Sequence, residues 1–194
     1  MTEIRLLLPI SALLIALLQG CAAAVVGGAA TGTSVAHDRR SAGTMMDDEV
    51  IEMKILTGSM QDEDLRKHTH ISATSYNYVV LLTGRADTVE HRNRFVELAR
   101  YTPMVKQIIS EVEIGPASTL TETSKDAYIT SKVKLALFDI KLEGFDPSRV
   151  KVVTENGVVY LMGLVRPAEA HEVVEKARYV KNVKRVVKAF EYIR

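Results

Sequence analysis

The chain contains 194 residues, of which 47% are hydrophobic and 25% are charged, and its formal net charge is +1. This composition is typical of a folded globular protein and excludes wholesale disorder. The near-neutral balance does not indicate a strongly electrostatic partner, so we expect no binding to nucleic acid. A single cysteine excludes an internal disulfide, so the hydrophobic core alone must hold the fold together.

The N-terminal segment has the features of an export signal. Residues 6–18 carry no charge, which suits the apolar region of a signal peptide and is shorter than the ~20 residues of a membrane-spanning helix. The tetrapeptide LQGC that follows ends at Cys21 and resembles the bacterial lipobox, in which the cysteine is acylated and becomes the mature N-terminus. We therefore expect a lipoprotein signal peptide at 1–20 and a lasting lipid anchor on Cys21.

Residues 21–44 are interpreted as a flexible tether. They are rich in alanine, glycine, serine and threonine, and they show neither helical nor strand periodicity. In lipoproteins of bacteria with two membranes, the absence of aspartate after the acylated cysteine implies sorting to the outer membrane. Here the residue after the cysteine is Ala22.

Two copies of one unit follow the tether. Residues 46–114 and 124–192 align at an offset of 78 or 79. The strongest match joins 79–84 to 158–163. This internal similarity indicates a duplication.

Each copy shows the same succession of patterns: a helical stretch, two short strands around a tight turn, a second helical stretch and a final strand. In the second copy, Asn156-Gly157 is a pair favoured in two-residue hairpin turns, and Pro167 suits the first turn of the second helix. We therefore expect an α+β fold with two tandem domains, each an α-β-β-α-β unit with two helices packed on a three-stranded mixed sheet. The expected boundaries are 45–115 for the first domain, 116–123 for the linker and 124–194 for the second domain.

This order of elements, with Gly84 and Gly163 closing the second strand of each copy, resembles the BON domain family. The resemblance covers nearly the whole chain after Cys21, and together with the lipobox it is similar to outer-membrane lipoproteins that carry two BON domains. It implies a protein that binds anionic phospholipid, gathers at the division site and supports outer-membrane integrity from the periplasmic side. The two glycines themselves are interpreted as strand ends that permit a turn or a close helix-strand approach.

The first helix of the second copy shows two separate apolar stripes when its residues are placed at 100° steps. One stripe has the width of a core-facing surface, about 100°. Its members are Ile129, Val133, Ala136, Leu137 and Ile140. The other stripe contains Tyr128, Leu135 and Phe138. A core does not need this second stripe, so we look for a function on it.

An anionic membrane is the expected ligand of the second stripe, because lysines flank it. These are Lys125, Lys132 and Lys134. Interfacial helices place apolar groups at the acyl boundary and ammonium groups at the level of the phosphates. The family resemblance implies a tryptophan at the position of Tyr128, and tyrosine offers less apolar area. The alternative is that the stripe packs against the first copy and forms the interface between the domains.

The corresponding helix of the first copy is acidic. Its stripe contains Val50, Thr57 and Met60, and the acidic residues beside it are Asp47, Asp48, Glu49 and Glu52. Residues 45–115 carry 8 basic and 12 acidic groups, a net −4, whereas 116–194 carry 14 and 10, a net +4. We therefore expect the second copy to face the membrane. The run 47–49 is interpreted as favourable charge in the first turn of a helix, not as catalytic or calcium-binding carboxylates.

No metal, cofactor or catalytic site is expected. His68 and His70 form the only close histidine pair, and on a strand their rings would share one face, but no cysteine or tight acidic cluster completes a ligand set. His37, His91 and His171 are isolated. Nucleophile elbow, phosphate loop, dinucleotide fingerprint and zinc-protease motif are all absent from the sequence. The chain is therefore interpreted as a non-enzyme.

Three classes of function compete. A lipoprotein that binds anionic phospholipid and acts by its location is favoured, and we expect it to be a monomer. The second class is an envelope adaptor that binds a protein partner, such as the outer-membrane protein assembly machinery, through its sheet surfaces or its acidic first helix. The third, a haemolysin or other secreted effector, is disfavoured by the anchored N-terminus.

Overall fold

The computed structural model describes residues 38–194. The expected signal peptide, the expected acylation site Cys21 and most of the expected tether lie outside the described residues. Within the described part, no helix combines the length and the apolar composition needed to cross a bilayer.

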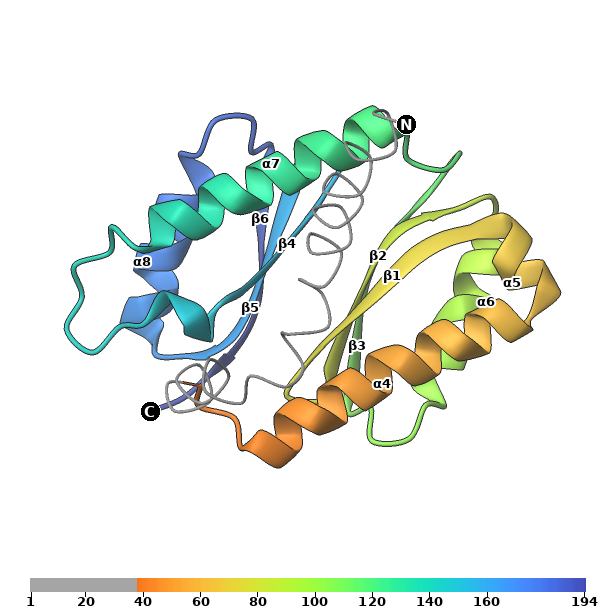
Figure 1. Cartoon of the computed structure of the whole chain (residues 1–194), viewed down its shortest axis with the longest axis horizontal. Coiled ribbons are helices and arrows are strands. Elements are labelled where there is room, and N and C mark those ends of the chain that lie inside the picture. The colour runs from red at the N-terminus through yellow and green to blue at the C-terminus, as the bar shows by residue number, and fades with distance from the viewer. Residues whose placement is uncertain (1–37) are drawn as a thin grey trace, which may run out of the picture. The chain divides into compact units, whose positions relative to one another are not determined.

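Each copy has the expected α-β-β-α-β order (Figure 1). The first copy comprises α4 (Ala42–Gln61), α5 (Glu63–His68), β1 (Thr69–Tyr76), β2 (Val79–Ala86), α6 (Val89–Arg100) and β3 (Gln107–Ile114). The second comprises α7 (Leu120–Leu137), the short 3-10 turn η1 (Pro147–Arg149), β4 (Lys151–Glu155), β5 (Val158–Val165), α8 (Pro167–Arg178) and β6 (Arg185–Tyr192). In each three-stranded sheet the middle strand pairs antiparallel with one neighbour and parallel with the other. The expected α+β fold with two mixed sheets is confirmed, and α5 is an addition found only in the first copy.

The middle strand of each sheet is buried on both faces. In β2, Val80 and Leu82 belong to the core beneath the helices of the first copy. The alternate residues Val79 and Leu81 belong to a different cluster, which they share with Tyr160 and with other side chains of the second sheet. The two sheets therefore pack against each other, with their helices on the outer faces. Burial on both faces explains why the segment from 79 to 82 is a continuous apolar run and does not alternate.

The structure corrects the expected end of the tether. Helix α4 begins at Ala42, and Ser41 caps it by accepting a hydrogen bond from the backbone N–H of Thr44. Upstream of this helix, both Nη atoms of Arg39 donate to the carboxylate of Glu169 at 2.6 and 2.7 Å. The sequence did not indicate that Arg39 belongs to the folded part, because its partner Glu169 lies 130 residues further along the chain.

The early start of α4 also corrects the expected role of the acidic run 47–49. Because the helix begins five residues before this run, Asp48 lies in its second turn and is only 2% exposed. Its carboxylate accepts hydrogen bonds from the backbone N–H groups of Asn77 and Tyr78, both at 2.8 Å, in the turn between β1 and β2. Asp126 does the same in the second copy, where it binds the N–H groups of the turn at 156–157 at 2.7 and 2.8 Å.

The two glycines of the repeat lie inside strands, not at their ends. Gly84 pairs with Ile71 in the β1–β2 ladder and has a φ of +113°. A Cβ atom placed on Gly84 would lie 2.1 Å from the carbonyl oxygen of His70, and one on Gly163 would lie 2.7 Å from that of Arg149. The close approach therefore involves the preceding backbone, which is strand β1 for Gly84 and the last residue of η1 for Gly163.

Candidate functional site

Helix α7 is fixed in place by its cap and by one buried face. Thr119 and Glu122 form a capping box, in which the Thr119 side chain accepts from the N–H of Glu122 and the Glu122 carboxylate accepts from the N–H of Thr119 at 2.8 Å. The buried apolar residues are Ile129, Val133, Leu137 and, just beyond the helix, Ile140. Of the expected core stripe, only Ala136 is half-buried. This anchoring determines which residues of α7 point away from the core.

The second stripe of α7 points outward. Tyr128 is 54% exposed, Leu135 is 61% exposed and Phe138, which caps the end of the helix, is 68% exposed. The apolar cluster between the two domains contains strand residues and no member of this stripe, so the alternative in which the stripe packs against the first copy is wrong. Leu120, 88% exposed at the start of the same helix, was not part of the expected stripe. We refer to Leu120, Tyr128, Leu135 and Phe138 as the α7 stripe.

The three expected lysines flank the α7 stripe and are exposed. The Nζ atom of Lys132 lies 5.4 Å from the ring centre of Tyr128, within the range of a cation–π contact. Lys125 and Lys134 lie on the same helix. Among the described residues, no carboxylate forms an ion pair with any of these three ammonium groups. They are therefore free to meet anionic groups from outside the chain.

A surface hollow extends the α7 stripe toward the loops at the end of the sheet. Its volume is about 420 Å³, and Lys125, Tyr128 and Asn182 are among the residues that line it. A neighbouring hollow of about 570 Å³ has a mixed lining, in which Lys125, Asn182, Lys184 and the turn at 156–157 lie beside Ile129 and the carboxylates of Glu122 and Asp126. Asn182 and Lys184 come from the loop before β6 and were not predicted, because sequence spacing gives no indication that this loop lies beside α7.

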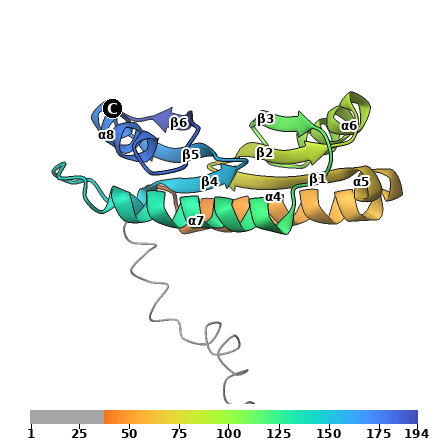
Figure 2. The same ribbon diagram turned by 90° about the horizontal axis from the view of Figure 1, so that it is seen from above.

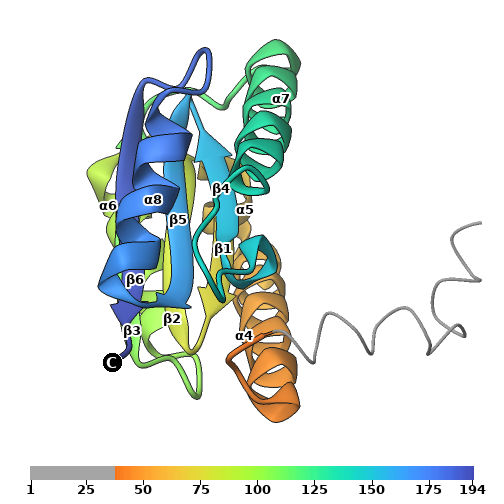
Figure 3. The same cartoon turned by 90° about the vertical axis from the view of Figure 1, so that its left-hand side faces the viewer.

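Helix α4 has an exposed apolar stripe of its own. Figures 2 and 3 show α4 and α7 on the same side of the two sheets. The exposed apolar side chains of α4 are Met46, Val50, Met53, Leu56 and Met60. The expected face contained Val50, Thr57 and Met60, so it included only two of these five side chains, although the seven-residue spacing of the three methionines indicates one helical face. Asp47, Glu49 and Glu52 on the same helix give this stripe an acidic surround.

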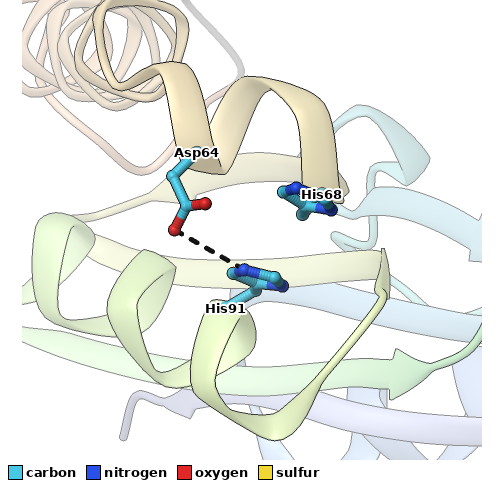
Figure 4. A group of neighbouring side chains, drawn as sticks. All are labelled: Asp64, His68 and His91. Atoms are coloured by element: carbon cyan, nitrogen blue, oxygen red, sulfur yellow. Dashed lines mark ion pairs between the residues drawn. The ribbon is translucent and has the colours of Figure 1, made fainter.

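The expected histidine pair does not form. His68 ends helix α5, whereas His70 lies in β1, so the two rings do not share the face of one strand. The ring of His68 instead stacks on that of His91, which was expected to be isolated, with the ring centres 4.5 Å apart. Asp64 lies beside both histidines (Figure 4). This cluster belongs to the first copy alone.

Comparisons with known proteins agree with the duplicated architecture. The BON domain family matches residues 47–116 and 125–194. The chain is 35% identical over 177 residues to the outer membrane lipoprotein DolP of Haemophilus influenzae, a match that covers 91% of this chain and 90% of that protein. It is 36% identical over 159 residues to the 21 kDa hemolysin of Actinobacillus pleuropneumoniae, covering 80% and 79%. Among solved structures, CdsD of Chlamydia trachomatis matches with a TM-score of 0.29 and 14% identity, over 75% of this chain and 63% of that one.

Proposed function

The chain belongs to the BON domain family and carries two copies of that domain, and on this premise we propose that it is an outer-membrane lipoprotein that binds anionic phospholipid through the α7 stripe. Cys21 is the proposed acylation site. The proposed location is the periplasmic face of the outer membrane, with enrichment at the division site and a role in outer-membrane integrity. The Haemophilus influenzae relative is named an outer membrane lipoprotein, which supports the proposed compartment. The proposal assigns the chain no catalytic role and treats it as a monomer.

The observation that supports lipid binding most strongly is an exposed apolar surface edged by unpaired lysines. Tyr128, Leu135 and Phe138 are each more than half exposed. Apolar surface of this kind gains free energy by leaving water, and a phenol ring suits the boundary between headgroups and acyl chains. Lysines near an anionic surface contribute about 1 kcal/mol each, and salt weakens this contribution. The two contributions together favour an anionic bilayer over a neutral one.

The proposed anchor and the proposed lipid-binding surface have different functions. Acyl chains on Cys21 would hold the protein on its membrane continuously. The α7 stripe then meets lipid at a high effective concentration, so a weak intrinsic affinity is enough. In this arrangement the anchor keeps the protein on the membrane, and the second domain selects where on the membrane it gathers.

Vesicle binding by the unacylated unit tests the proposal. Residues 38–194 form a compact unit that contains all three hydrophobic clusters, and it carries no acyl chain that would mask a weak surface. We expect this unit to sediment with vesicles that contain phosphatidylglycerol, and not with pure phosphatidylcholine vesicles. Binding should fall as salt is raised from 50 to 500 mM, a range chosen to span strong and weak screening, on the order of 14 to 4 Å. Equal binding to both vesicles would contradict the proposal.

The methionine-rich stripe of α4 favours a second candidate function, the envelope adaptor. Methionine side chains adapt to varied partners, and exposed methionine stripes are typical of protein-binding surfaces. An acidic surround suits a basic protein surface and opposes an anionic membrane. A photo-crosslinking residue placed at Met53 in the full chain should then capture one defined protein, such as a component of the outer-membrane protein assembly machinery. The same residue at Tyr101, which is exposed at the C-terminal cap of α6, should not.

A further inference from the structure

A cluster of two histidines and an aspartate lies between α5 and α6 of the first domain (Figure 4). Asp64 and His68 are one turn apart on α5, and His91 lies in the first turn of α6. The two imidazole rings stack with an angle of 7° between their planes. One ligand atom from each of the three side chains lies within 4.8 Å of the other two. Figure 4 shows the Asp64 carboxylate pointing toward the imidazoles, with Oδ2 at 3.5 Å from Nε2 of His91.

Hydrogen bonds determine which nitrogen of each imidazole is available. Nδ1 of His68 lies 2.8 Å from a carboxylate oxygen of Asp87. Nδ1 of His91 lies 3.0 Å from the hydroxyl of Thr88. In a histidine that ligates a metal, the ring nitrogen that does not bind the ion almost always forms a hydrogen bond to an oxygen, and this bond orients the ring. Both Nε2 atoms therefore remain for a ligand, and one of them already faces Asp64.

The fold itself does not require this cluster. His91 occupies the third helical position of α6, and the same position of α8 in the second copy holds Glu169, which pairs with Arg39. Helix α5, which supplies Asp64 and His68, has no α-helical counterpart in the second copy, where only the short 3-10 turn η1 precedes the first strand.

We propose that Asp64, His68 and His91 bind one divalent transition-metal ion of the Zn²⁺, Ni²⁺ or Cu²⁺ class, a function separate from that of the α7 stripe. Two imidazoles and one carboxylate suit these ions, whereas Mg²⁺ and Ca²⁺ take oxygen ligands. Zinc forms bonds of about 2.0 to 2.2 Å, so the ligand atoms must approach one another to about 3.4 Å. The Asp64, His68 and His91 side chains are 45%, 42% and 17% exposed, which leaves room for the required rotations. A bound ion would tie α5 to α6.

Arg94 is the competitor for the aspartate. Its guanidinium lies 3.0 Å from Asp64 and 2.6 Å from Asp62. Metal binding requires Asp64 to exchange its ion pair with Arg94 for the cation, whereas Arg94 retains Asp62. Removal of Arg94 should therefore raise the affinity for the metal ion. A cluster that serves only to hold α5 against α6 would not gain affinity for a metal ion in this variant.

Isothermal titration with ZnCl₂ on the untagged unit 38–194 tests the proposal. This unit holds four of the five histidines and no cysteine, so neither Cys21 nor His37 contributes to the signal. We expect saturable binding of one Zn²⁺ per chain and a rise in Tm when zinc is present. His68→Ala and His91→Ala should each abolish saturable binding. Asp64→Asn should weaken it about tenfold or more, and Arg94→Ala should strengthen it.

His70→Ala and His171→Ala are matched controls, because each removes an exposed imidazole from outside the cluster. Both should bind zinc like the wild type, and circular dichroism should show that every variant is folded. Absence of saturable binding by the wild type would overturn the proposal. Binding that survives in a folded variant with both His68→Ala and His91→Ala would overturn it equally, since the zinc would then occupy another site.

Discussion

Arg39 forms a two-pronged ion pair with Glu169, and the pair connects the segment before the first domain to helix α8 of the second. The Glu169 side chain is 3% exposed and that of Arg39 is 16% exposed. Loss of one partner leaves a buried charge without compensation, which is costly. We expect Arg39→Ala to lower the free energy of unfolding by about 2 to 3 kcal/mol. Urea denaturation of the unit 38–194 measures this, with Arg66→Ala, an exposed arginine of α5, as the control.

Acid should weaken the same link. Burial raises the pKa of Glu169, but the hydrogen bonds from Arg39 and from the N–H of Arg166 lower it by more, so the pKa lies below its usual value. A carboxylate with a lowered pKa stabilises the fold above the usual glutamate pKa, about 4.3, and loses that contribution as the pH falls below it. The stability difference between wild type and Arg39→Ala should therefore be constant near neutral pH and shrink below about pH 4.3. A difference that grows in acid would contradict this assignment.

Asp126 should be among the most sensitive positions of the second domain. Its carboxylate satisfies two backbone N–H groups in the β4–β5 turn, and the residue is 8% exposed. Asp126→Ala leaves both donors without a partner, so we expect a loss of about 2 to 4 kcal/mol. Asp139→Ala, an exposed aspartate just after the same helix, should change stability by less than about 0.5 kcal/mol. Comparable losses in the two variants would show that the turn does not depend on Asp126.

Two glycines should respond to alanine with opposite signs. Gly84 has a positive φ, and an added Cβ would collide with the carbonyl of His70, so Gly84→Ala should cost about 3 kcal/mol. Gly43 lies in the first turn of α4 with nothing closer than 3.7 Å to an added Cβ. Gly43→Ala should therefore stabilise the chain by about 0.5 kcal/mol through helix propensity. Chemical denaturation of both variants checks this contrast.

The order of elements could be predicted because it depends on local periodicity and on an internal repeat. Hairpin residues such as Asn156 and Gly157, and the apolar stripe that contains Ile129 and Val133, carry their signals within a few positions. The contacts of Asp48 and Asp126 with their turns could not be derived in this way. Each carboxylate reaches a partner about 30 residues away, and only the packed helix and hairpin bring them together.

The outward face of α7 could be predicted from the sequence, but the residues that surround it could not. Placing Tyr128, Leu135 and Phe138 at helical angles separated them from the core, yet periodicity shows only which residues share a face, not what covers it. The exposed fractions of the three side chains, which the sequence does not give, exclude interdomain packing, and lipid contact stays a prediction. The position of Asn182 beside α7 and the stacking of His68 on His91 could not be predicted. Both depend on loops and helix ends that are distant in the sequence and meet only in the folded chain.

The lysines of α7 should act through charge. Lys132 aligns with Lys54 of the first copy, and both side chains are exposed, so the two positions form a matched pair. Lys132→Gln should weaken binding of the unit 38–194 to phosphatidylglycerol vesicles about fivefold at low salt, corresponding to roughly 1 kcal/mol. Lys54→Gln should leave the affinity unchanged, since α4 is not the proposed membrane face. Equal effects would indicate a general charge effect and no defined surface.

Entry of the α7 stripe into the membrane is tested most directly by Tyr128→Glu. The substitution places a carboxylate where the phenol ring is 54% exposed, so it should leave the fold intact while opposing contact with anionic lipid. Tyr101→Glu makes the same change at a tyrosine of the first domain that is 80% exposed. In co-sedimentation of the unit 38–194 with phosphatidylglycerol vesicles, Tyr128→Glu should abolish binding, keep a native circular-dichroism spectrum, and differ from Tyr101→Glu, which should bind like the wild type. Undiminished binding by folded Tyr128→Glu would contradict the account.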